Sequence, residues 1–121
     1  MNKLLVIDEN AGVVKVMSDI LAQESGSFTL YGAATSIEAE DILSKENPPI
    51  ALVRADSQAC IAAAESLQKK SDDIRFILMS RNTKGQTELI KKFDPLVKIN
   101  LPFDPDEFAD MIEDAFSTAQ I

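Results

Sequence analysis

The sequence contains no histidine and only one cysteine among its 121 residues. Without histidine, the chain lacks the commonest general base and the commonest neutral metal ligand. Ser-His-Asp catalysis, histidine-ligated zinc and phosphohistidine chemistry within the chain are therefore excluded. The lone Cys60 has no partner for an internal disulfide, which fits a reducing compartment, and we expect it to be a small apolar residue on a helix.

Long apolar runs and basic residues are also scarce. No stretch approaches the roughly 18 apolar residues of a membrane helix, and the apolar run near the start meets Asp8 too soon for a secretory signal. We therefore expect a cytoplasmic protein that does not enter a membrane. Only 12 Lys and Arg oppose 20 Asp and Glu, and the net charge of −8 disfavours nucleic-acid binding, because proteins bind phosphate backbones through Lys and Arg.

What the sequence does contain is a regular alternation of short apolar runs and amphipathic stretches. The runs predict strands at residues 3–8, 28–33, 50–55, 74–80 and 96–100. The amphipathic stretches predict helices at residues 10–24, from just after Thr35 or Ser36 up to Asn47, at 57–70, at 84–93 and from Asp104-Pro105 onward. In the second helix, the stripe Ile37, Ala39, Ile42 and Leu43 is expected to face the core.

This alternation predicts one α/β domain over residues 1–121. Its architecture is a doubly wound (βα)5 fold, with a parallel five-stranded sheet, helices on both faces and right-handed crossovers. The strand order 2-1-3-4-5 is the flavodoxin-like choice for such a sheet. Ligands bind beyond the carboxyl ends of its strands, so Asp8 and Glu9, which follow the first strand, are the expected place for chemistry and can hold a cation such as Mg²⁺.

Segments spread over nearly the whole chain resemble the CheY-like receiver domain of bacterial two-component response regulators. They are Leu-Leu-Val-Ile-Asp8-Glu9-Asn, Phe28-Thr-Leu-Tyr-Gly-Ala-Ala34, Ile37-Glu-Ala-Glu-Asp-Ile-Leu43, Ile77-Leu-Met-Ser80 and Pro102-Phe-Asp-Pro-Asp-Glu-Phe108. The resemblance implies Mg²⁺-assisted phosphoryl transfer from a histidine kinase or a small donor to an aspartate at the end of the third strand. It also implies that Asp8 and Glu9 match the metal pair and that Ser80 matches the hydroxyl that binds the phosphoryl group.

Two alignments compete for the acceptor position. Without a gap, Ala55 falls on it, whereas a shift of one residue recruits Asp56. The choice matters because a one-residue slip along a strand reverses the face to which a side chain points. We favour the gap-free alignment, in which Asp56 is the N-cap of the third helix. In the other alignment Asp56 is the phosphoacceptor and joins Asp8 and Glu9 on Mg²⁺.

Other parts of the family site are changed. Leu101 stands where the family has its phosphate-binding lysine, and removing one such electrostatic donor costs about 3 kcal/mol in other enzymes. Lys98 occupies the place of the usual switch aromatic, and we interpret it as an exposed strand lysine that discourages edge pairing. Arg81 follows Ser80 where the family prefers a small residue, and it can either bind an anion or pair with Asp56.

We therefore interpret the chain as a degenerate receiver domain in two-component signalling, which binds a histidine kinase or downstream effector, is not an enzyme and works independently of aspartyl phosphorylation. The alternative is an active phosphoacceptor, in which Asp56 accepts and at most releases a phosphoryl group, and Arg81 or Arg54 replaces the missing lysine. A flavodoxin shares the fold, but residues 8–11 lack the Gly/Ser/Thr-rich phosphate loop that flavin binding needs.

The expected contact surface, also for a homodimer, is built from the fourth helix, the fifth strand and the fifth helix. It carries Lys91, Lys92, Phe93, Lys98, Asp106, Glu107 and Asp110.

Overall fold

Strands and helices alternate along the whole described chain. The computed structural model describes residues 2–24, 27–82 and 85–119. In order, the elements are β1 (Asn2–Ile7), α1 (Ala11–Glu24), β2 (Phe28–Ala33), α2 (Ser36–Glu46), β3 (Ile50–Arg54), α3 (Gln58–Lys70), β4 (Arg75–Ser80), α4 (Thr87–Phe93), β5 (Val97–Asn100) and α5 (Pro105–Ala119). The helix predicted near 84–93 begins three residues late, at Thr87, and residues 83–84 lie outside the described part.

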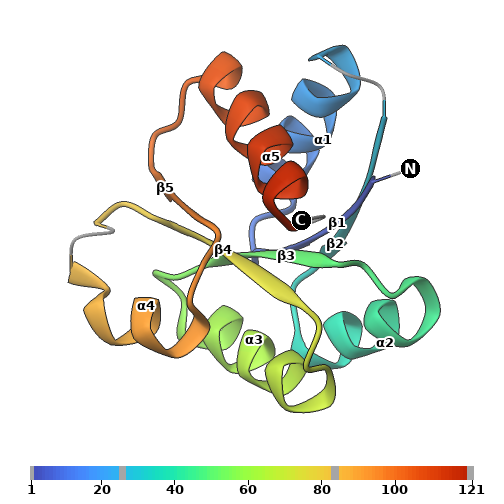
Figure 1. The fold of residues 1–121 in the computed structure, drawn as a ribbon, viewed down its shortest axis with the longest axis vertical. Helices are drawn as coiled ribbons and strands as arrows, with labels where there is room; N and C mark the ends of the chain where they lie inside the picture. The colour runs from blue at the N-terminus through green and yellow to red at the C-terminus, as the bar shows by residue number, and fades with distance from the viewer. Residues whose placement is uncertain (1, 25–26, 83–84, 120–121) are drawn as a thin grey trace.

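The five strands form one parallel sheet in the order β2-β1-β3-β4-β5, as predicted. Figure 1 shows α1 and α5 on one side of this sheet and α2, α3 and α4 on the other. The carboxyl ends of β1, β3 and β4 therefore meet at the same edge, between the two helical layers, which is the position where open parallel sheets bind ligands. Within the described ranges, no helix combines the length and apolar character needed to cross a membrane.

The core is divided by the sheet into two apolar clusters. In β1, Leu5 and Ile7 pack toward α2, α3 and α4, whereas Leu4 and Val6 pack toward α1 and α5. Because both faces are covered, all four of these side chains are fully buried, and Leu4–Ile7 form an uninterrupted apolar run. Cys60 is buried on α3 as expected, and burial raises the pKa of its thiol.

The predicted apolar stripe of α2 is wrong at its first member. Ala39 is buried and Ile42 packs against the core, but Ile37 is 79% exposed. At about 100° per residue, Ile37 lies some 200° round the helix from Ala39 and therefore on the opposite face. The helix begins as a capped turn, since the Thr35 hydroxyl accepts a hydrogen bond from the Glu38 N–H at 3.2 Å.

A polar brace joins strands β1 and β2 to the end of α2. The Tyr31 hydroxyl donates to Glu46 Oε1 at 3.0 Å, and Lys3 Nζ lies 3.3 Å from the same oxygen. The hydrogen bonds from Tyr31 and Lys3 lower the pKa of Glu46. A carboxyl group with a lowered pKa stabilises the fold above its unfolded pKa, and this stabilisation is lost as the pH falls through the folded pKa.

Replacing Tyr31 by Phe is therefore expected to destabilise the protein at neutral pH and to make less difference in acid, where Glu46 is protonated. Urea unfolding of wild type and Tyr31→Phe at both pH values measures this. In a Glu46→Gln background the same substitution should show no such pH dependence. An equal loss of stability at both pH values in the otherwise wild-type chain would contradict the prediction.

Candidate functional site

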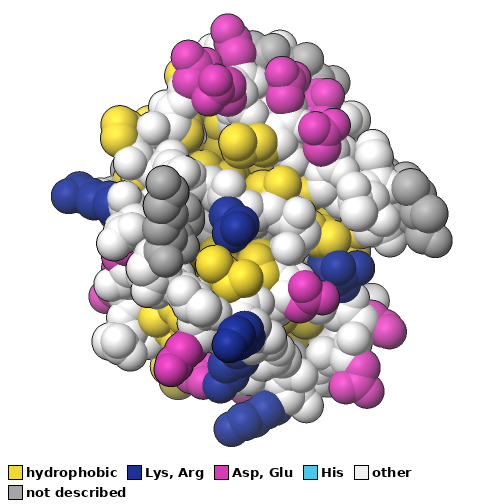
Figure 2. All heavy atoms as spheres, turned by 60° about the vertical axis from the view of Figure 1, so that its left-hand side comes forward, with side chains coloured by type: hydrophobic (Ala, Val, Ile, Leu, Met, Phe, Trp, Pro, Cys, Tyr) yellow, Lys and Arg dark blue, Asp and Glu magenta, His cyan; other side chains and the backbone are white. Residues whose placement is uncertain are grey.

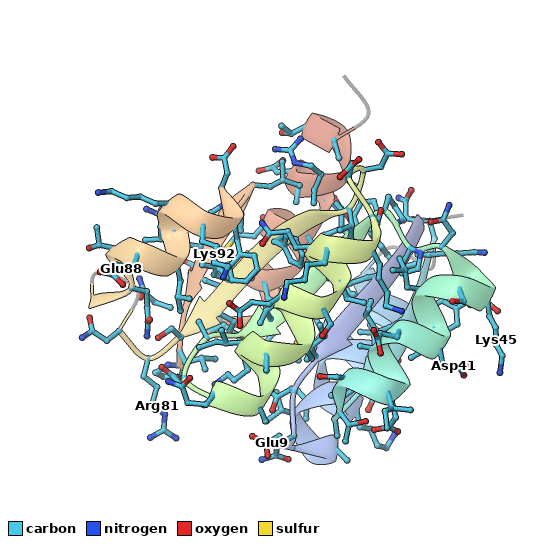
Figure 3. All side chains as sticks on the ribbon, turned by 90° about the horizontal axis from the view of Figure 1, so that it is seen from below. Glu9, Asp41, Lys45, Arg81, Glu88 and Lys92 are labelled. Atoms are coloured by element: carbon cyan, nitrogen blue, oxygen red, sulfur yellow. The ribbon has the colours of Figure 1, made fainter. Side chains whose placement is uncertain are left out.

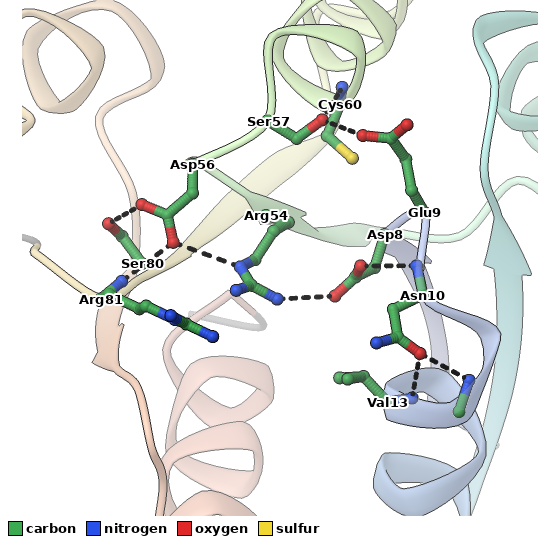
Figure 4. Close-up of polar contacts among 11 residues, drawn as sticks. Asp8, Glu9, Asn10, Val13, Arg54, Asp56, Ser57, Cys60, Ser80 and Arg81 are labelled. Atoms are coloured by element: carbon green, nitrogen blue, oxygen red, sulfur yellow. Dashed lines mark hydrogen bonds and ion pairs between the residues drawn. The ribbon is translucent and has the colours of Figure 1, made fainter.

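Four polar side chains meet where β1, β3 and β4 end. Asp8 follows β1, Arg54 is the last residue of β3, Asp56 lies two residues beyond it, and Ser80 ends β4 (Figure 4). The structure thus brings together Asp8, Asp56 and Ser80, the residues that the sequence predicted for this edge. It also adds Arg54 between the two carboxylates.

Asp8 is a buried carboxylate, with its side chain only 4% exposed. Its Oδ1 accepts a hydrogen bond from the Asn10 N–H at 2.9 Å, and its Oδ2 lies 3.4 Å from Arg54 Nη1. A buried charge is costly unless a partner of opposite charge is in place, and Arg54 is that partner among the described residues. Asn10 in turn accepts from the N–H groups of Gly12 and Val13 and so fixes the start of α1.

Both carboxylate oxygens of Asp56 are engaged. Oδ1 accepts a hydrogen bond from the Ser80 hydroxyl at 2.6 Å, and Oδ2 accepts from the Arg81 N–H at 3.0 Å and from Arg54 Nε at 3.3 Å. Burial raises the pKa of Asp56, but the hydrogen bonds from Ser80, Arg81 and Arg54 together lower it by more. Asp56 is therefore held as a carboxylate in a closed network of donors.

The prediction that Asp56 caps α3 is wrong. The N-cap is Ser57, whose hydroxyl accepts a hydrogen bond from the Cys60 N–H. Asp56 is instead in the turn between β3 and α3, and this turn directs its carboxylate across to β4. Strand alternation ends at Ala55, which donates its N–H to Met79 O at 2.8 Å and buries its methyl group in the apolar cluster under α2, α3 and α4.

Glu9 does not join the other acids. Its carboxylate accepts a hydrogen bond from the Ser57 hydroxyl, so it contacts the start of α3 instead of Asp8 or Asp56. In Figure 3, Glu9 and Arg81 both lie at the edge where the strands end and point outward. Within the part of the chain that the structure describes, no group of three or more acidic, histidine or cysteine side chains could hold a metal ion.

As folded, this edge does not fit Mg²⁺. The ion needs about six oxygen ligands at about 2.0–2.1 Å in nearly regular octahedral geometry. Here the guanidinium of Arg54 lies between the carboxylates of Asp8 and Asp56 and contacts one oxygen of each (Figure 4). The remaining Asp8 oxygen accepts from Asn10, and the remaining Asp56 oxygen accepts from Ser80. A cation, Arg54, is already present where the acids converge.

A cavity of about 820 Å³ opens beside the network. Arg54 and Arg81 lie on one side of it, and its apolar wall includes Leu101 and Phe103 from the segment that leads into α5. Leu101 thus provides an apolar surface where the resemblance predicted a phosphate-binding lysine. Lys98 is exposed on β5, at the edge of the sheet, as its interpretation as a strand lysine required.

The sequence reasoning missed the double ion pair of Arg54. The available signal was a single charged residue closing the otherwise apolar run Ile-Ala-Leu-Val-Arg of β3. An arginine that ends a central strand reaches the edge of the sheet where ligands bind, and its long side chain can span two acids there.

Comparisons with known proteins agree with this fold. No family model matches the chain. The sporulation initiation phosphotransferase F of Bacillus subtilis (strain 168) is 25% identical over 116 residues, which cover 92% of this chain and 90% of that protein.

Solved structures show the same architecture. A CheY-like response regulator receiver domain protein from Methanospirillum hungatei JF-1 matches with a TM-score of 0.82 and 15% identity, over 99% of this chain and 97% of its own. The non-phosphorylated HemR receiver domain from Leptospira biflexa matches with a TM-score of 0.79 and 20% identity, over 97% and 95%. These findings show that the chain has the fold of CheY-like response regulator receiver domains and that it is similar in sequence to the Bacillus phosphotransferase.

Proposed function

We propose that this receiver domain works in two-component signalling by binding another signalling protein, a histidine kinase or a downstream effector, without forming a phosphoaspartate. It is then a cytoplasmic interaction module and not an enzyme. The observation that carries the proposal is the closed network at Asp56. Its two oxygens accept from Ser80, Arg81 and Arg54, so the hydroxyl and the cation that would hold a phosphoryl group are bound to the acceptor itself.

The apolar cavity wall supports the same proposal. Phosphoryl transfer is catalysed mainly by cations and donors placed around the charged oxygens. Leu101 offers neither a charge nor a hydrogen bond at the place where the family has its lysine, and it packs against the apolar cluster under α1 and α5. Arg81 is exposed, with its side chain directed outward (Figure 3).

The surface formed by α4, β5 and α5 is the contact face that we propose for the partner. Figure 2 looks onto this side of the molecule, where acidic side chains crowd the top, over α5, and Lys and Arg side chains lie in the middle and lower half together with further acidic ones. The exposed acids of α5 are Asp106, Glu107, Asp110, Glu113 and Asp114, and the exposed lysines of α4 and β5 are Lys91, Lys92 and Lys98. Such a separation of charge suits a partner with the opposite arrangement, including a second copy related by a twofold axis. The prediction that Phe93 belongs to this surface is wrong, because its side chain is buried in the core.

Incubation with a small phosphodonor such as acetyl phosphate in millimolar Mg²⁺ tests the proposal directly. We expect the intact mass to stay unchanged, because the oxygens of Asp56 are occupied by donors and no lysine neutralises the incoming group. An active receiver domain treated in parallel shows that the donor works.

Amide NMR spectra with beryllofluoride, which mimics a phosphoryl group, provide a second readout. The spectrum should not change at Asp56 or Ser80. A gain of one phosphoryl mass in wild type that is absent from Asp56→Asn would overturn the proposal and establish the active phosphoacceptor instead.

A further inference from the structure

The starting point is the buried charge of Asp8. Receiver domains generally bind Mg²⁺ at the phosphorylation site, and a divalent ion there neutralises acids that the fold has removed from water. In this chain the side chain of Asp8 is 4% exposed, and the Asn10 N–H that donates to its Oδ1 carries no net charge to balance it. A carboxylate this buried needs a cation close by.

Arg54 is built to be that cation. It ends the central strand β3, where it pairs with Met79 of β4, and its side chain is only 18% exposed. Nη1 lies 3.4 Å from Asp8 Oδ2, and Nε lies 3.3 Å from Asp56 Oδ2. The planar guanidinium presents several donors in fixed directions, which allows one side chain to bridge two carboxylates.

We propose that Arg54 is a permanent internal counter-ion that takes the place of the divalent metal. It holds Asp8 and Asp56 together, and with Ser80 and Arg81 it fixes the ends of β1, β3 and β4 in one arrangement without any added ion. The domain is therefore independent of Mg²⁺ in stability and conformation. This inference goes beyond the proposed function and does not depend on it, because Arg54 would bridge the two acids whether or not Asp56 accepts a phosphoryl group.

Electrostatics gives the proposal a clear consequence. A divalent ion added beside Arg54 would be repelled by the guanidinium and would have to displace its contacts with Asp8 and Asp56. A neighbouring unit charge changes the proton affinity of a carboxylate by about 10- to 1000-fold, and the same field acts on a bound metal ion. Removing the charge of Arg54 should therefore strengthen divalent-ion binding at this edge by at least about tenfold.

Manganese provides the readout, since Mn²⁺ binds the same oxygen ligands as Mg²⁺ and broadens nearby amide signals. In wild type we expect no selective broadening around Asp8 and Asp56. In Arg54→Gln we expect selective broadening at these two positions, at Mn²⁺ concentrations at least about tenfold lower than those that affect wild type. Added Mg²⁺ should compete with Mn²⁺ and reverse this broadening. Mg²⁺ should also raise the melting temperature of Arg54→Gln and leave that of wild type unchanged.

Two control variants separate charge from position. Arg81→Gln removes the neighbouring arginine of the same cavity, which contacts Asp56 through its backbone N–H, and this variant should behave like wild type toward Mn²⁺. Arg54→Lys keeps the charge and should also bind Mn²⁺ weakly. Selective broadening at Asp8 and Asp56 in wild type would overturn the proposal, and this test needs no variant to fold. A folded Arg54→Gln that gains no Mn²⁺ affinity would overturn it as well.

The two proposals fail in different ways. Phosphorylation of wild type together with weak Mn²⁺ binding would remove only the proposed function. Tight Mn²⁺ binding without phosphorylation would remove only the role of Arg54.

Discussion

Replacing Arg54 by methionine is expected to lower the free energy of unfolding by about 3 kcal/mol. Methionine keeps the unbranched apolar stem of the side chain but removes the guanidinium, which leaves the carboxylate of Asp8 buried without its cation. Asp56 loses one of its three donors but stays bonded to Ser80 and Arg81, so most of the loss should come from Asp8. Urea unfolding at neutral pH in the absence of divalent ions measures the difference.

A double mutant identifies the cause. Asp8→Asn removes the buried charge, so Arg54→Met combined with Asp8→Asn should lose clearly less stability than the sum of the two single variants. The matched control is Lys70→Met on α3, whose Nζ lies 3.2 Å from Glu40 but whose side chain is 57% exposed. An ion pair this exposed contributes about 0–1 kcal/mol. If Arg54→Met cost no more than Lys70→Met, the buried ion pair would not support the fold.

Replacing Phe93 by alanine is expected to cost about 3–5 kcal/mol and to loosen α4. Phe93 is 5% exposed and is the buried residue of this short helix, and its ring lies 4.9 Å from that of Phe76 on β4. The substitution leaves a cavity under α4 and removes the aromatic pair that joins the helix to the sheet.

Hydrogen exchange measured residue by residue tests this prediction. Amides of α4 should lose protection beyond the global loss of stability, whereas those of α1 and α5 on the other side of the sheet should change only with global stability. Lys91→Ala, at an exposed position on the same helix, is the control and should have little effect. A uniform loss of protection over the whole chain would show that α4 unfolds only together with the rest of the domain.

The fold could be read largely from local patterns. Runs such as Leu4–Ile7 are apolar at every position because both faces of a parallel sheet are covered. This pattern can be recognised without knowing which strands and helices pack against the run. The strand order was predicted as the flavodoxin-like choice for a five-stranded doubly wound sheet, and the structure confirms it. The prediction for Ile37 was wrong because this residue was assigned to the core from its apolar side chain and not from its angle around the helix.

The site was predictable only in part, because its residues come from segments far apart in the chain. The sequence placed Asp8, Glu9 and Ser80 at one edge of the sheet, since the ends of parallel strands must meet there, and it favoured Ala55 over Asp56 for the acceptor position. It did not show that the turn after Ala55 carries the Asp56 carboxylate across to Ser80, because strand alternation stops where the strand stops.

Composition and periodicity alone thus predicted a doubly wound α/β fold with an acidic edge and excluded histidine chemistry. Composition and periodicity indicate the helix or strand propensity and the burial of each segment, and these can be read from neighbouring residues in the sequence. The partners of those acids were decided only in three dimensions. Arg54 lies 46 residues from Asp8 along the chain, and an ion pair depends on where two side chains end in space and on how much water remains between them. The tertiary structure therefore placed an arginine, and not an open metal site, between the acids.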